Sequence, residues 1–262
     1  MLAEPALAYA GNAMPRSEIA ADLTATVEDY LQSIYSLETE GERIISARLA
    51  RWMRVTPPTA WATVRRMARD GLVSVDAKKT IHLTKRGREL AEKVARRHRL
   101  SERFLNDVLG LGWAEAHDEA HHFEHGLTPA IEGRIFSLLG NPTTCPHGSP
   151  IPGTGAVLSP DLIPMDTLEQ GDAATVEFIS EELEEDLELL RYLDRQNVRP
   201  GQAITVDEKV RSTGLISINT GREPVSLGLN VAARIRVRPG AARSAKSRTS
   251  SGSRSRRAAP RS

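Results

Sequence analysis

Histidines and carboxylates crowd the stretch HDEAHHFEH, residues 117–125, which holds four histidines, two glutamates and one aspartate. Residues three and four apart share one face of a helix, so a helical conformation would gather most of these side chains on one side. The residues on that face are His117, His121, Glu124 and His125. Imidazole and carboxylate groups bind divalent transition-metal ions, so the spacing predicts a metal site.

A second pair of this type, His98 and Glu102, lies four positions apart on a long helix expected at 85–109. One pair alone also fits a solvated polar helix face, but two pairs on consecutive helices can converge on one space. An enzyme is a further alternative, because zinc peptidases carry the motif H-E-x-x-H. Here Asp118 stands where that motif has its glutamate, and the sequence shows no nucleophile motif or phosphate-binding glycine loop. We therefore expect metal binding without catalysis.

The region before the long helix has the order of elements of a winged helix-turn-helix. Apolar periodicity predicts helices at 26–39, 47–53 and 57–70, with Ser46 and Thr56 as the N-caps of the second and third. Alternating apolar residues at 73–75 and 81–83 predict a hairpin, and Thr84 is the expected N-cap of the long helix. This order favours DNA binding over a purely structural subdomain.

Charge supports a polyanionic partner more strongly than the net value of +1 suggests. Residues 44–90 hold eleven Lys and Arg against three acidic residues, a local charge of +8. The tail, residues 241–262, adds seven basic residues and no acid. Such local basicity is typical of nucleic-acid-binding proteins, so we expect double-stranded DNA as a partner.

The remaining pattern predicts an α+β chain with helices at 113–126 and 128–139 and a small β-barrel-like domain around one helix at 181–196. Strands are expected at 174–180, 202–210, 215–220 and 231–237. One cysteine, no apolar run of membrane-spanning length and no signal-peptide pattern favour the reducing cytoplasm, with no membrane partner. The expected domains are a flexible N-terminus (1–22), a winged helix-turn-helix (23–90), a helical dimerisation and metal-binding domain (91–140), a Pro/Gly-rich linker (141–164), a β-domain (165–239) and a disordered basic tail (240–262).

Several motifs in this order resemble the diphtheria toxin repressor family of metal-dependent transcriptional regulators. They are DYLQSIYSLETEG, RRMARDGLV, RRHRLSERFL, HDEAHHFEH and PHGSPIPG, and the similarity covers about residues 24–153. The region beyond resembles the SH3-like (FeoA-like) domain that many members append. The resemblance implies a homodimeric, metal-activated repressor of metal-homeostasis genes that binds a palindromic operator. A metal-independent winged-helix regulator is the alternative.

The resemblance also implies two metal sites. The primary ligands would be Asp29, His121, Glu124 and His125, and the ancillary ligands His98, Glu102 and His117. The iron-responsive branch has methionine in place of Asp29 and cysteine in place of His121, whereas the manganese branch has glutamate in place of both Gln32 and His121. Hard carboxylates with imidazoles suit Mn(II) or Fe(II), and we favour Mn(II); Zn(II) or Co(II) can bind more tightly in vitro.

Two further pairs of ligand-type residues lie outside these sites. Iron-responsive relatives take additional ligands from a Glu and a Gln three apart in the β-domain, and Glu185 and Glu188 are the nearest match, although a solvated acidic helix is favoured there. Cys145 and His147 lie in a proline-rich loop, where a structural turn is favoured over a metal pair.

For DNA recognition, the third helix should enter the major groove with its N-terminal residues nearest the base edges. Thr56, Pro58 and Thr59 match the family's contacting Ser, Pro and Thr, whereas Ala62 replaces a glutamine contact. Trp61 is expected to pack on sugar or a thymine methyl. The expected phosphate contacts are Arg51, Arg54, Arg65, Lys78 and Lys79.

Overall fold

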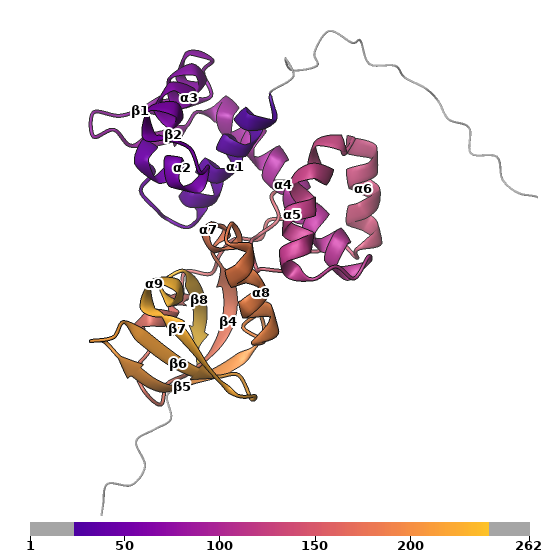
Figure 1. Cartoon of the computed structure of the whole chain (residues 1–262). Coiled ribbons are helices and arrows are strands. Elements are labelled where there is room, and N and C mark those ends of the chain that lie inside the picture. Colours follow the sequence, from indigo (N-terminus) through magenta and orange to yellow (C-terminus); the bar gives the residue numbers. More distant parts are fainter. Residues whose placement is uncertain (1–23, 241–262) are drawn as a thin grey trace, which may run out of the picture. The chain divides into compact units, whose positions relative to one another are not determined.

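The computed structural model describes residues 24–240, so the expectations for 1–22 and for the tail from 241 onward lie outside the described residues. Two compact units are present, one formed by residues 24–38 and 43–94 and the other by 39–42 and 95–240 (Figure 1). Helices and an antiparallel sheet together give the expected α+β class. No helix within residues 24–240 is long and apolar enough to cross a membrane.

The first unit is a winged helix-turn-helix. Its helices are α1 (Ala25–Thr39), α2 (Ser46–Trp52), α3 (Pro57–Arg69) and the beginning of α4 (Lys85–Asp107), and the wing is the antiparallel pair β1 (Val73–Val75) and β2 (Ile81–Leu83). Leu31, Ile34, Leu49, Val64 and Ile81 are fully buried in one core, because the apolar positions of each helix recur at helical spacing.

Local capping fixes the start of the recognition helix and of α4. The side chain of Thr56 accepts a hydrogen bond from the Thr59 N–H at 3.4 Å, and Pro57 follows in the first turn, where a missing N–H costs nothing. Thr84 Oγ1 accepts from the Gly87 N–H at 3.0 Å. The expected cap of α2 is wrong: Ser46 is the first helical residue, and Ile45 precedes it without a side-chain cap.

The second unit joins a helical part to a six-stranded sheet. The helical part contains the end of α4, α5 (Trp113–Phe123), the short 3-10 helix η2 (Glu124–Gly126) and α6 (Pro129–Leu138). The sheet has the order β3-β8-β4-β5-β6-β7, from β3 (Ile163–Pro164), β4 (Ala173–Ile179), β5 (Ala203–Val210), β6 (Leu215–Asn219), β7 (Pro224–Gly228) and β8 (Ile235–Pro239). Register shifts in β4 and β5 bend the sheet.

The structure corrects three expectations for the β-domain. The helix expected at 181–196 is broken into α7 (Glu181–Glu184) and α8 (Leu187–Arg195), because Asp186 Oδ1 accepts from the Leu189 N–H at 3.1 Å and caps a new helix. The strand expected at 231–237 begins only at residue 235, after the short helix α9 (Leu229–Ala232). The edge strand β7 was not expected from the sequence.

The helical part and the sheet share one core. Trp113 and Ala114, at the start of α5, are buried together with sheet residues such as Val176 and Ile235. The loop that was expected to be a plain linker is also packed, since Cys145, His147 and Ile151 are buried. Gly148 is required there: its φ is +95°, and a Cβ would lie 2.2 Å from the Glu177 carbonyl oxygen.

Gly87→Ala tests the close approach of α4 to the preceding segment. A Cβ at residue 87 would lie 1.9 Å from the Leu72 carbonyl oxygen, so we expect a lower free energy of unfolding by about 1–3 kcal/mol. Thermal unfolding followed by circular dichroism measures the change. The matched control is Gly133→Ala on α6, where a Cβ meets nothing within 4 Å and a gain of about 0.5–1 kcal/mol is expected. Equal melting temperatures for both variants would contradict this packing.

Candidate metal centre

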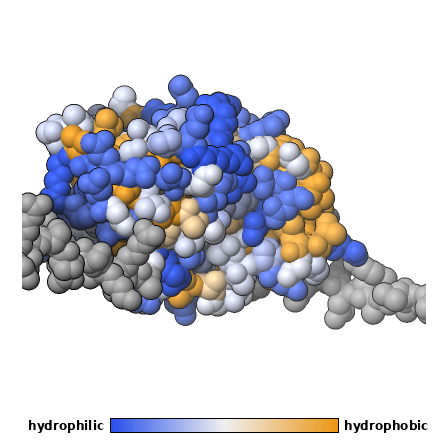
Figure 2. Space-filling view, turned by 90° about the horizontal axis from the view of Figure 1, so that it is seen from below, coloured by the Kyte–Doolittle hydropathy of each residue, from blue (hydrophilic) through white to orange (hydrophobic). Residues whose placement is uncertain are grey.

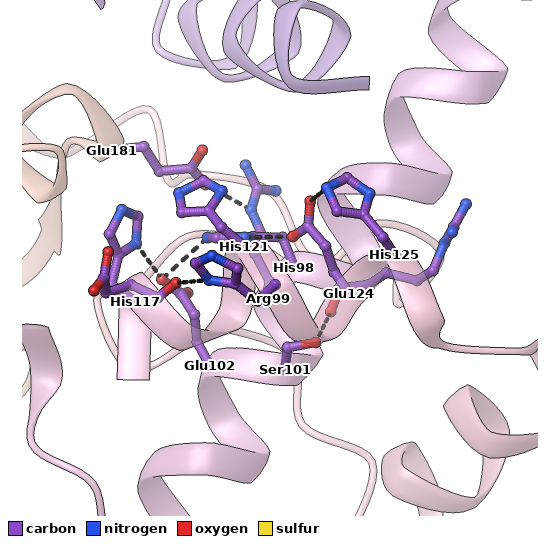
Figure 3. Close-up of polar contacts among 12 residues, drawn as sticks. His98, Arg99, Ser101, Glu102, His117, His121, Glu124, His125 and Glu181 are labelled. Atoms are coloured by element: carbon purple, nitrogen blue, oxygen red, sulfur yellow. Dashed lines mark hydrogen bonds and ion pairs between the residues drawn. The ribbon is translucent and has the colours of Figure 1, made fainter. Parts of the chain in front are cut away.

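Two helices deliver the sequence-predicted ligands to one buried region of the second unit. His98 and Glu102 lie one turn apart on α4, and His117 and His121 lie one turn apart on α5 (Figure 3). His98, Glu102 and His117 are at most 3% exposed. Glu124 begins η2 and is 1% exposed, so the end of α5 adds a buried carboxylate.

The carboxylate of Glu102 lies at the centre of this region. Its Oε1 is 2.9 Å from His117 Nδ1, 3.3 Å from His98 Nε2 and 3.4 Å from His147 Nδ1. Burial alone would raise the pKa of Glu102, but the positive charges of His147 and His98 and the hydrogen bond from His117 hold it well below its usual range. Glu102 is therefore ionised at neutral pH and attracts cations.

His147 and Glu184 belong to the same cluster. The sequence interpretation favoured a structural turn for His147 and did not single out Glu184. His147 Nδ1 is 3.2 Å from Glu184 Oε2, and Glu184 Oε2 is 3.5 Å from His117 Nδ1. Cys145 Sγ lies 3.9 Å from His147 Nδ1, and both side chains are buried in the 141–164 loop. In the β-domain Glu181 and Glu184 are buried, whereas Glu188 is exposed.

The protonation of this cluster follows from its burial and its charges. Burial alone would lower the pKa of His147, but Glu184 and Glu102 raise it well above its usual range. Burial raises the pKa of Glu184, and it raises that of the Cys145 thiol to about 11. His147 is consequently protonated at neutral pH, and a cation would have to displace that proton.

Glu124 organises the other predicted ligands. Its Oε2 is 2.6 Å from His98 Nδ1, and its Oε1 is 3.9 Å from His125 Nε2. Burial alone would lower the pKa of His98, but Glu124 and Glu102 raise it well above its usual range. Burial and then the charges of His98 and His117 lower the pKa of His121 to about 2, so this imidazole is neutral at physiological pH.

Many potential ligand atoms in this region are buried without a hydrogen-bond partner. They are Nε2 of His117 and His147, Oε2 of Glu102, Oε1 of Glu124 and Oε1 of Glu184. An unsatisfied buried polar atom costs about 1–3 kcal/mol, so a concentration of them requires an explanation. Divalent-ion binding supplies one, because each of these atoms is an imidazole or carboxylate donor. The residues therefore fit a metal ion.

Buried hydrogen bonds hold the β-domain's contribution in place. Arg99, 2% exposed, donates from Nε to Glu181 Oε1 at 2.8 Å and from Nη1 to the Pro150 carbonyl oxygen. Ser180 donates to Glu40 Oε2 at 2.6 Å, and burial raises the pKa of Glu40 to about 7. These contacts flank α7 and position Glu184.

Asp29 is the one predicted ligand that lies in the first unit. It is half-buried on α1, and its carbonyl oxygen accepts from Ser33 Oγ at 2.9 Å. Its role as a metal ligand stays a prediction.

The predicted DNA-binding residues gather on the recognition helix, the end of α2 and the wing. They are Arg51, Arg54, Thr56, Pro58, Thr59, Arg65, Lys78 and Lys79, all exposed, and Trp61, half-buried. Lys79 Nζ lies 5.9 Å from the centre of the Trp61 ring, at a cavity of about 510 Å³ that both residues line with Arg43. Arg43, which the sequence interpretation did not single out, donates to the Lys78 carbonyl oxygen at 2.7 Å and so fixes the wing.

Comparison with known proteins agrees with this arrangement. The model of the iron-dependent repressor N-terminal DNA-binding domain matches residues 22–81, that of the iron-dependent repressor metal-binding and dimerisation domain matches 84–153, and that of the FeoA domain matches 163–239. The iron-dependent repressor IdeR of Mycobacterium leprae is 37% identical over 226 residues, covering 82% of this chain and 98% of the relative. The chain belongs to the iron-dependent repressor family.

Solved structures extend the comparison to other ions. A manganese-dependent transcriptional repressor in complex with manganese matches with a TM-score of 0.71 and 33% identity, covering 81% of this chain and 99% of that one. The structure of ScaR with bound Zn²⁺ matches with a TM-score of 0.67 and 28% identity, covering 80% and 98%. The resemblance found in the sequence is thus confirmed, and this repressor family consists of metal-dependent DNA-binding proteins, which are not enzymes.

Metal binding by this repressor should release protons and strengthen as pH rises. His98 and His147 have pKa values well above the usual range, so each must lose a proton before its nitrogen can serve as a ligand. We expect release of about one proton or more per ion near pH 7. Calorimetric titration in buffers of different ionisation enthalpy measures it. A binding enthalpy independent of the buffer would contradict these protonation states.

Proposed function

We propose that this chain is a homodimeric repressor of metal-homeostasis genes, activated by Mn(II) or Fe(II) and directed to a palindromic operator. The observation that carries the proposal is the cluster of buried, unpartnered imidazole and carboxylate atoms on α4, α5 and α7. The basic surface of the first unit supplies the complementary DNA-binding function. Such a function belongs in the cytoplasm.

The donor chemistry favours Mn(II) over Fe(II). Carboxylate oxygens suit hard divalent ions, and the soft cysteine and methionine ligands of the iron-responsive branch are replaced by His121 and Asp29. Cys145 is the only sulfur donor in the cluster, and burial raises the pKa of its thiol to about 11, which disfavours the thiolate. Zn(II) and Co(II) can still bind more tightly in vitro, as the Irving–Williams order requires.

We assign the two predicted sites as follows. The primary site takes its ligands from Asp29, His121, Glu124 and His125. The ancillary site takes His98, Glu102 and His117, to which we add Glu184 and His147 from their contacts with Glu102 and His117. A bound divalent ion would supply positive charge that balances these carboxylates and would link the segments that carry them.

The chain's own residues then determine the effect on DNA. Glu124 and His125 follow α5, whereas Asp29 lies on α1 beside the helix-turn-helix, so shared ligation restricts the angle between the DNA-binding and dimerisation parts. The two recognition helices of a dimer must lie about 34 Å apart, or a multiple of it, to reach both half-sites. Restricting the angle raises operator affinity, and linkage requires that operator binding tighten metal binding by the same factor.

Exposed apolar side chains support dimerisation through the helical part. Val108 and Leu109 follow α4 and are 48% and 56% exposed, while Ile131 and Leu138 on α6 are 46% and 66% exposed. In Figure 2 apolar surface gathers towards one side of the molecule, the side on which Figure 1 draws α6. Burying these side chains between two copies would remove them from water.

Glu124→Ala and Asp29→Ala should each abolish metal-dependent operator binding while leaving a folded dimer, because each removes a primary ligand. The measurement is retention of a palindromic site, selected from randomised duplexes, with and without Mn(II), together with the oligomeric state. His122→Ala is the matched control, since His122 is exposed on α5, two residues before Glu124, and its Nδ1 contacts the Asp118 carbonyl oxygen at 3.2 Å. A normal metal response in the Glu124 variant would refute the assignment, and wild-type binding that ignores a chelator would favour a metal-independent regulator.

Lys79→Ala should weaken binding to all duplexes alike and reduce the salt dependence of the binding constant by about one counterion. The reason is that an exposed wing lysine contacts phosphate rather than bases. Fluorescence anisotropy at several salt concentrations measures the slope. Lys93→Ala, an exposed lysine on α4 outside the wing and the recognition helix, serves as the control. An unchanged slope would remove Lys79 from the interface.

A further inference from the structure

A cavity of about 510 Å³ lies in the first unit, where the wing meets the start of α2, and it shares no residue with the metal centre. Three basic residues line it, Arg43, Lys78 and Lys79, and its lining contains no acidic residue. Trp61 on α3 supplies an aromatic wall, and Ser46 at the first position of α2 adds a hydroxyl group. Cavities of about 300–1,000 Å³ that combine apolar walls with a few convergent polar groups are typical of small-ligand sites.

Hydrogen bonds within the protein hold the wing residues of this cavity in place. Arg43 donates from Nη2 to the Lys78 carbonyl oxygen at 2.7 Å and from Nε to Thr80 Oγ1 at 3.3 Å. Asp76 Oδ1 accepts from the Thr80 N–H at 2.8 Å, and the Asp76 carbonyl oxygen accepts from the Lys79 N–H at 3.0 Å. Because these bonds close the turn of the wing, they fix the backbone that carries the two lysines.

Lys79 has a backbone conformation that lysine rarely adopts. Its φ is +61°, in the left-handed region that glycine and asparagine usually occupy in turns. Glycine would form the same turn more easily, so a lysine held in this conformation points to a role for its side chain. Lys79 Nζ lies 5.9 Å from the centre of the Trp61 ring, and this ring packs against the core of the helix-turn-helix.

A phosphate ester of a nucleoside has the two features that this cavity can recognise. Its negative charge suits the guanidinium of Arg43 and the ammonium of Lys79, and both groups are common phosphate ligands. Its sugar and base offer faces that pack or stack on an aromatic ring such as that of Trp61. A bare anion would use the charges alone, and an uncharged nucleoside would use the ring alone.

We propose that this cavity binds one nucleoside phosphate unit, with the phosphate held by Arg43 and Lys79 and the sugar or base packed on Trp61. A DNA strand and a free nucleotide share this chemistry. The inference rests on the proposed function only for the DNA strand, where it adds Arg43 to the contacts expected from the wing. A free nucleotide in the same cavity would compete with the strand for the wing and so oppose repression.

The test titrates the metal-stripped full chain and follows tryptophan fluorescence. Trp52 and Trp113 are buried, so the signal of the half-buried Trp61 is the difference between the wild type and Trp61→Phe. The probes are thymidine 5′-monophosphate, thymidine, inorganic phosphate and a short duplex of random sequence. We expect the monophosphate to quench Trp61 saturably and to bind about tenfold or more tightly than thymidine or phosphate, because it alone engages both the cations and the ring.

The pattern of responses identifies the source of the nucleotide unit. A response to the monophosphate and to the duplex, with each displacing the other, assigns the site to both sources, and a response to the duplex alone assigns it to the DNA strand. No response to either would overturn the proposal. A response to inorganic phosphate as strong as that to the monophosphate would also overturn it, because the ring would then contribute nothing.

Variants connect the signal to the proposed groups. Arg43→Ala and Lys79→Gly should each weaken binding of the responding ligand by about fivefold or more, whereas Arg43→Lys, which keeps the charge, should retain part of the affinity. Lys79→Gly also relieves the left-handed backbone, so its loss of binding cannot come from added strain. Lys93→Ala, an exposed lysine on α4 outside the cavity, is the control and should bind as the wild type does.

Wild-type affinity in both Arg43→Ala and Lys79→Gly would exclude the cavity as the binding site. The titration contains no metal ion, so its failure would leave Mn(II)-dependent operator binding untouched. Conversely, loss of the metal response in the operator experiment would not change the fluorescence titration. The two proposals can therefore fail separately.

Discussion

The buried carboxylate of Glu102 imposes the constraint on which the second unit depends. Removing an ionised carboxylate from water costs several kcal/mol unless opposite charge and hydrogen bonds compensate it. Here His98, His117 and His147 provide that compensation from α4, α5 and the 141–164 loop. These three segments must therefore pack against each other for Glu102 to remain ionised, and the ligand cluster is a consequence of that packing.

The β-domain contributes further charged groups to this buried cluster. Glu184 adds a second carboxylate beside His117 and His147, and Arg99 holds α7 through Glu181. Imidazoles alone satisfy this arrangement incompletely, since Glu184 Oε1 and the Nε2 atoms of His117 and His147 lack hydrogen bonds. A divalent ion would complete the coordination of atoms that are already held in place by the protein, so little reorganisation is needed to bind it.

The sequence predicts those parts of the site that follow a helical repeat. His117 and His121 are recognisable because four-residue spacing places them on one face, and the same holds for His98 and Glu102. Glu184 cannot be recognised in this way, because residues 181–188 contain several glutamate pairs with equal spacing. Only the break at Asp186 decides which glutamate faces inward.

The burial of loop residues and the contacts between distant segments cannot be predicted from helical or strand periodicity. His147 lies in a loop without periodicity, and its burial depends on contacts with residues distant in sequence. The alternating apolar residues of VAARIRV predict a strand, but the first of these residues belong to the short helix α9. The burial of α9 is determined by its packing against the surrounding sheet. The winged helix-turn-helix, by contrast, is specified by local caps and apolar spacing, so its elements are predicted to within a few residues.

Trp113 has a consequence for the modularity of the chain. Its indole begins a helix of the dimerisation part, yet it is buried in the core of the sheet and meets His147 edge-on, with the ring centroids 4.7 Å apart. A recombination event that exchanged the FeoA-like domain for another would expose this ring unless the incoming sheet offered a matching cavity. The helical part and the sheet therefore depend on each other for a closed core, and neither can be exchanged without a replacement surface for Trp113 and its apolar neighbours.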